Sequence, residues 1–232
     1  MPASIASLAS YAPQAAKLFG TMIAPSSILA GSMIALGLTA AIPLKPDEKE
    51  TVVASTLRLM YPILALMTLS SELLAVIWAT IAVNQLTETD VPMTESVWHL
   101  LSNEFALQWA AVNSHFVFGM FGFMVIIAIR LYFMCGQGGM GLSAVGLTMS
   151  VLMFMISIVN RAVATGGGNG IRYGTTVLAL FERYFSLFMK RAVTYETFGA
   201  VEVLAVATMI VSLLTYVSYA AMSFENRKNK EA

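Results

Sequence analysis

The stretch that decides the fold is residues 61–86, YPILALMTLSSELLAVIWATIAVNQL. A helix of this length rises about 1.5 Å per residue and crosses the hydrocarbon core of a bilayer. Its single charged residue, Glu72, lies near the middle. An ionisable side chain at that depth is costly to expose to lipid, so we expect it to face protein or water. The stretch predicts a membrane-spanning helix with one buried carboxyl.

Four further stretches have similar length and apolar character, namely residues 19–44, 109–134, 142–163 and 199–224. Of the 232 residues, 58% are hydrophobic and 11% are charged, whereas a soluble domain carries about 25% charged residues. Most of the surface is therefore expected to meet lipid or apolar protein. The sequence predicts an all-α fold: a polytopic membrane helical bundle of about five transmembrane helices, in a single integral-membrane domain over residues 1–232.

Residues 176–192 follow a different pattern, with an apolar and a polar side at helical spacing. The apolar side is largely aromatic and the polar side carries charges of both signs: Val177, Phe181, Tyr184, Phe185 and Phe188 against Glu182, Ser186, Lys190 and Arg191. The pattern predicts an amphipathic helix in the membrane interface. The alternative is a re-entrant segment or sixth span in which Glu182 and Arg183 are buried as a pair.

Small side chains recur at helical spacing in the predicted spans, and such faces let neighbouring helices approach closely. Glu72 shares a face with Ala75, Ala79 and Ala82, so it is expected to meet another helix. Two further small-residue faces are expected to pack: Ser27, Gly31, Ala35 and Thr39 in the first span, and Ser143, Gly146, Ser150 and Ser157 in the fourth. Pro25 is expected in the first turn of the first span, where its missing N–H matters least.

The polar residues of the spans are expected to gather on one side of the membrane. Successive helices run in opposite directions, which assigns a depth to each residue. The third of the membrane nearest the N-terminus receives Asn84, Asn113, His115, Asn160, Arg161 and Glu202. His115 shares a face with Ala111 and Gly119 and is expected to point inward. We expect Arg161 and Glu202 to pair or to share a network with Asn160, and Glu72 to lie deeper. Near the opposite surface, Arg130 is expected to extend toward the headgroups.

Several classes of function are not predicted. Thirteen basic and thirteen acidic residues leave no basic excess for nucleic acid, and the single cysteine, Cys135, allows no internal disulfide. No His-Glu-x-x-His, Gly-x-Ser-x-Gly or paired-cysteine motif is present, so no enzyme is predicted. No cofactor is predicted either. We expect His115 to be packed and hydrogen-bonded between helices. The alternative is that it is an axial ligand to haem or to chlorophyll magnesium.

Two functional hypotheses remain nearly level. The first is a small ion channel or transporter subunit that uses Glu72, in a path that opens to the polar pocket. The second is a non-catalytic membrane subunit or assembly factor of a larger complex, such as a photosynthetic or respiratory one. In the second case Glu72 is a hydrogen-bonded carboxyl that joins two helices. The expected partners are the lipid bilayer and either further copies of the chain or a larger membrane complex.

The C-terminal residues Lys228-Asn229-Lys230-Glu231-Ala232 add a hint about location. The two lysines resemble the dilysine KxKxx signal, which returns membrane proteins to the endoplasmic reticulum from the cytosolic face. The resemblance implies an endomembrane trafficking protein with a cytosolic C-terminus, while the alternative is a plain basic anchor. Residues 87–108 contain no Lys or Arg, which favours an outer or lumenal position for the N-terminal side.

Overall fold

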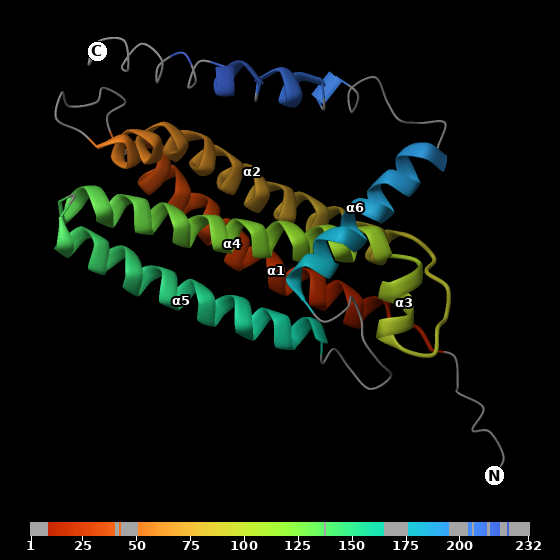
Figure 1. The fold of residues 1–232 in the computed structure, drawn as a ribbon. Coiled ribbons are helices and arrows are strands. Elements are labelled where there is room, and N and C mark those ends of the chain that lie inside the picture. The colour runs from red at the N-terminus through yellow and green to blue at the C-terminus, as the bar shows by residue number, and fades with distance from the viewer. Residues whose placement is uncertain are drawn as a thin grey trace. The chain divides into compact units, whose positions relative to one another are not determined.

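The computed structural model describes residues 9–39, 42, 51–136, 138–164, 176–194, 204–205, 207–212, 214–218 and 222. The elements named within these ranges are helices (Figure 1). They are α1 (Ala12–Met33), the π-helix η1 (Ile34–Thr39), α2 (Val52–Glu88), α3 (Val97–Asn103), α4 (Ala106–Met134), α5 (Gly139–Ala164) and α6 (Val177–Thr194). The chain forms two compact units, Met1–Leu187 and Phe188–Ala232. The bundle described below belongs to the first unit, and the single domain expected from the sequence stays a prediction.

Four helices are long and apolar enough to cross a membrane: Ala12–Thr39, Val52–Glu88, Ala106–Met134 and Gly139–Ala162. They confirm the all-α, multi-pass membrane bundle. The first helix begins at Ala12 rather than near residue 19, so Pro25 lies inside it and not in its first turn. The fifth predicted span, 199–224, is described only in part, and the described residues show there a shorter apolar helix, Ala207–Ser218. The predicted amphipathic helix is present as α6, and its place in the membrane interface stays a prediction.

The long helix α2 lies against both α1 and α4, and α4 in turn lies against α5 (Figure 1). Thr51 caps its first turn by accepting a hydrogen bond from the amide of Ala54 at 3.2 Å. Ala75, Ala79 and Ala82 of α2 are completely buried, as their shared face predicts. At the end of the bundle near α3, Phe19 and Trp109 pack edge to face with centroids 5.3 Å apart.

The two other small-residue faces do not pack within this bundle. Ser27, Gly31, Ala35 and Thr39 are all exposed, and α1 instead buries the neighbouring face that carries Ser26, Ala30, Met33 and Gly37. In α5 the predicted serine face is also exposed, and Thr148 and Leu152 face the protein. The exposed hydroxyls of Ser143 and Ser150 donate to carbonyls one turn earlier in their own helix. This satisfies them without a neighbouring helix, so an apolar environment tolerates them.

Arg130 does not simply extend toward the headgroups, as the sequence suggested. Its Nη1 donates to the carbonyl oxygen of Leu36 at 3.0 Å. The Tyr61 hydroxyl donates to the same oxygen at 2.5 Å. Leu36 lies in η1, near the end of the first helix, where the partial negative charge of the helix dipole attracts a cation. Arg130 therefore binds the end of α1–η1 to α4, and Tyr61 binds it to α2.

Candidate functional site

The Glu72 carboxyl lies inside the bundle, where α1, α2 and α4 meet. Glu72 has no exposed surface. On α4, Gly119 leaves the space that the carboxyl fills, because a Cβ added there would lie 2.6 Å from Glu72 Cδ. On α1, the Ser26 hydroxyl lies beside the carboxyl but outside hydrogen-bond geometry. The alanine face of α2 and the glycine of α4 together place an acid between helices, as the sequence predicts.

Both carboxyl oxygens of Glu72 are buried without a hydrogen-bond partner among the described residues. The same holds for the hydroxyls of Ser26 and Ser114, which are 0% and 2% exposed. Most buried polar groups in proteins have partners, so each of these groups requires an explanation. An ionised carboxyl without a partner costs several kcal/mol at this depth, and a carboxyl that carries its proton avoids that cost.

His115 joins three helices through hydrogen bonds. Its Nδ1 is 3.0 Å from Ser71 Oγ on α2, and its Nε2 is 3.0 Å from the Tyr184 hydroxyl on α6. Ser71 Oγ is also 3.0 Å from the carbonyl oxygen of His115. The histidine therefore points inward, as its face predicts. A haem or pigment ligated by His115 would have to replace one of these hydrogen bonds.

One arrangement of protons satisfies all three contacts of this cluster. A serine hydroxyl has one proton, and the backbone carbonyl of His115 is only an acceptor, so Ser71 donates to that carbonyl. His115 Nδ1 must then carry the ring proton and donate to Ser71 Oγ. Nε2 is left as an acceptor, and Tyr184 donates to it. Burial raises the pKa of Tyr184, which keeps this phenol protonated and able to donate.

The first half of α6 is fastened to α4 and α5. Val177 and Leu180 are buried in a cluster with Val117 of α4. Asn160, near the end of α5, accepts a hydrogen bond at 2.7 Å from the amide of Val177. This amide belongs to the first turn of α6 and has no partner within the helix, so Asn160 acts as a cap from a distant part of the chain. The same anchoring brings Tyr184 to His115.

The other predicted site residues do not reach the Glu72 carboxyl. Asn84 is exposed, and Asn113 is half-buried and donates to the Trp109 carbonyl of its own helix at 2.7 Å. Arg161 is exposed on α5. Its predicted partner Glu202 lies outside the described residues, as do Lys228 and Lys230 of the possible retrieval signal. The structure therefore places Ser26 beside the Glu72 carboxyl, and it joins His115 to Tyr184 and to Ser71, the residue next to Glu72 in the chain.

Sequence reasoning missed most of the residues that surround Glu72. Ser71 was not among the predicted site residues, and Tyr184 appeared only as part of an apolar face. Ser26 sits next to Ser27, whose face was expected to pack instead. Tyr184 was the one residue whose role the sequence could have indicated. It lies on the apolar side of an amphipathic helix, and a buried phenol usually finds a hydrogen-bond partner.

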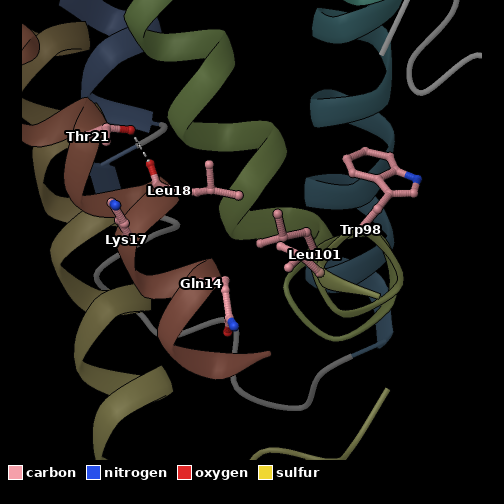
Figure 2. Close-up of a pocket in the computed structure, with 7 residues that line it drawn as sticks. Gln14, Lys17, Leu18, Thr21, Trp98 and Leu101 are labelled. Carbon is pink, nitrogen blue, oxygen red and sulfur yellow. Dashed lines mark hydrogen bonds between the residues drawn. The ribbon is translucent and has the colours of Figure 1, made fainter. Parts of the chain in front are cut away.

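A separate pocket lies between the first turns of α1 and the short helix α3 (Figure 2). Its volume is about 530 Å³. Gln14, Lys17, Leu18 and Thr21 line it from α1, and Val97, Trp98 and Leu101 from α3. The Thr21 hydroxyl in its wall donates to the Leu18 carbonyl at 2.7 Å. Neither Glu72 nor any of the residues described around it lines this pocket. The pocket is therefore separate from the Glu72 site.

Comparison with known proteins finds no match to this chain among protein-family models, curated proteins or solved structures.

Proposed function

We propose that the protein is a subunit of a small ion channel or transporter, in which Glu72 binds the transported ion or proton. The observation that carries this proposal is the fully buried carboxyl whose two oxygens have no hydrogen-bond partner among the described residues. Intramembrane acids are costly and usually mark ion or proton sites.

A purely structural role for Glu72 fits these contacts less well. A carboxyl that joins two helices does so by accepting or donating hydrogen bonds across their interface. Here Ser26 is the hydroxyl beside the carboxyl, but neither its oxygen nor the carboxyl oxygens have a hydrogen-bond partner of good geometry among the described residues. These two side chains supply oxygens that an ion or a proton carrier would use. They support a binding site that is incomplete until its ligand arrives.

We also propose that the working unit is a homo-oligomer or a larger membrane complex. Four described helices are too few to enclose a wide passage, because α1, α2 and α4 pack directly on one another and α5 packs on α4. The exposed small-residue faces of α1 and α5 allow close approach of another helix. The same faces suit the second hypothesis, a non-catalytic subunit or assembly factor, in which they dock on a larger partner.

Reconstituted flux tests the proposal. Vesicles that contain the purified chain are compared with vesicles that contain Glu72→Gln, for protons, Na⁺, K⁺ and Ca²⁺ in separate assays. Glutamine has nearly the same size but holds no charge and no exchangeable carboxyl proton, so flux is expected to disappear. Glu95→Gln, at an exposed position before α3, is the matched control and should keep wild-type flux.

Two results would overturn the proposal. The first is unchanged flux in Glu72→Gln while its helix content and oligomeric state match the wild type. The second is a wild-type chain without flux that purifies from its native membrane with a stoichiometric large partner or with bound pigment. That second result would support the subunit hypothesis.

A further inference from the structure

We infer that the ligand of Glu72 is a proton, which travels between the carboxyl and the α6 side of the bundle through Tyr184, His115 and Ser71. This inference rests on the proposed function, because it takes Glu72 as the binding group and identifies what it binds. The evidence is a row of exchangeable groups between a half-buried phenol and a fully buried acid, in which the links from Tyr184 to His115 and from His115 to Ser71 are direct hydrogen bonds.

The first two links are direct hydrogen bonds. Tyr184 Oη lies 3.0 Å from His115 Nε2, and His115 Nδ1 lies 3.0 Å from Ser71 Oγ. The phenol and imidazole rings are also in contact, edge to face, with centroids 5.1 Å apart. An imidazole bonded at both nitrogens can accept a proton on one side and release one on the other. This distinguishes His115 from a histidine that is held by a single hydrogen bond.

The last link joins Ser71 to its neighbour Glu72. Both side chains face α4, where Ser71 meets His115 and Glu72 meets Gly119. These two α4 residues are one helical turn apart, about 6 Å along the axis. In the relay, Ser71 passes the proton from the imidazole to the carboxyl of Glu72, the next residue in the chain. Rotation of its hydroxyl from the His115 carbonyl toward Glu72, or one bridging water, completes the row.

The outer end of the row lies on the amphipathic helix α6. Tyr184 is half-buried, while the charged side of the same helix exposes Glu182, Lys190 and Arg191. Water that hydrates this side reaches the rim of Tyr184. The Tyr184 hydroxyl is not needed to hold α6 against the bundle. The buried Val177 and Leu180 and the cap from Asn160 already do so.

Proton transfer along the row is balanced. The Tyr184 hydroxyl proton moves to His115 Nε2, and Tyr184 Oη takes a proton from a hydronium ion, which leaves as water. The Nδ1 proton moves to Ser71 Oγ, and the hydroxyl proton of Ser71 moves to the Glu72 carboxylate. One proton has entered from the hydronium ion and one has reached the acid. The ring now carries its proton on Nε2, and the reverse shift or a ring rotation resets it.

Hydrogen–deuterium exchange of the Glu72 carboxylic acid, measured by infrared spectroscopy, tests this path without relying on transport. The full chain is reconstituted in lipid, transferred to D₂O, and the C=O band that is missing from Glu72→Gln is followed in time. Tyr184→Phe and Ser71→Ala are expected to slow the exchange about tenfold or more, since each removes one proton-carrying group. Tyr132→Phe, which removes a phenol hydroxyl elsewhere in the bundle, should exchange at the wild-type rate.

Exchange at the wild-type rate in both Tyr184→Phe and Ser71→Ala would overturn the relay, as would a Glu72 that shows no carboxylic acid band at any pH at which the protein is folded. Flux measurements separate this failure from that of the proposed function. If Glu72→Gln abolishes flux while the two relay variants keep it, or if the flux is carried by a metal cation instead of protons, the relay is wrong and the Glu72 site stands. If Glu72→Gln keeps its flux, both proposals fail.

Discussion

Gly119 is the residue whose size decides whether the Glu72 carboxyl fits between the helices. A Cβ at this position would overlap the carboxyl group, and a Cβ at Gly122, one turn further along, would lie 3.2 Å from Thr68 Cβ. The two glycines thus face two polar side chains of α2. Close approach of α2 and α4 depends on both, because packed interiors leave little room for an added methyl.

Replacing Gly119 with alanine is expected to destabilise the bundle. The added methyl must displace the Glu72 side chain or separate α2 from α4, at a cost of about 1–3 kcal/mol. Thermal unfolding in mild detergent measures this as a lower Tm. Gly146→Ala is the matched control, because nothing lies within 4 Å of a Cβ there and the position is in a helix interior. Its stability should equal or exceed that of wild type, by about 1 kcal/mol at most. Equal stability of the two variants would contradict the described contact.

Leu36 shows that one backbone carbonyl can hold three helices. Tyr61 and Arg130 share its oxygen, so their contributions should be coupled. Tyr61→Phe is expected to cost about 0.5–1.5 kcal/mol, the usual net value of one hydrogen bond. The double variant with Arg130→Gln should differ from the sum of the two single variants by at least about 0.5 kcal/mol. Chemical unfolding of the four proteins measures this, and strictly additive effects would contradict a shared acceptor.

At the scale of the element, α6 depends on a residue that is remote in sequence. Asn160 of α5 caps its first turn by accepting the hydrogen bond of the Val177 amide. Asn160→Ala is expected to weaken the start of α6 by about 0.5–2 kcal/mol. Hydrogen exchange of the α6 amides, read by mass spectrometry, should become faster. Ser157→Ala, at an exposed position on the same helix, is the control and should leave exchange unchanged. Unaltered exchange in both variants would mean that α6 is held without the cap.

At the scale of the whole molecule, the order of spans places two loops on opposite sides of the membrane. The described spans α2 and α4 run in opposite directions, so the turn after α4, with Cys135, lies across the bilayer from the segment before α3, with Glu95. In sealed vesicles, a membrane-impermeant maleimide should label either Cys135 or a cysteine introduced as Glu95→Cys in a Cys135→Ser background, but not both. Opened vesicles, which should label both, are the control. Labelling of both from the same side would disprove the four-span topology. The same experiment determines the orientation, which the sequence indicates through the missing cations of residues 87–108 and through the resemblance of the last five residues to a dilysine signal.

Local pattern was sufficient for some parts of the candidate site and insufficient for others. The inward positions of Glu72 and His115 follow from periodicity. Small-residue faces pack against neighbouring helices, so a polar residue on such a face is placed inside the bundle. The exposed faces of α1 and α5 show the limit of that reasoning. Ser26 and Ser27 are adjacent, and either face could pack; the one that does is decided by how α1 lies against α2.

The sequence by itself determined that this chain is a multi-pass helical membrane protein, where the central parts of its described spans lie, and that Glu72 is enclosed by protein. The first two helices nevertheless begin at Ala12 and Val52, well before the expected residues 19 and 61. Hydrophobic length and helical spacing are local properties, and lipid imposes both on any spanning segment. Only the tertiary structure decided which residues surround Glu72. Gly119, Ser26 and the row from Ser71 through His115 to Tyr184 come from four helices, and their meeting depends on interhelical packing that no single segment encodes.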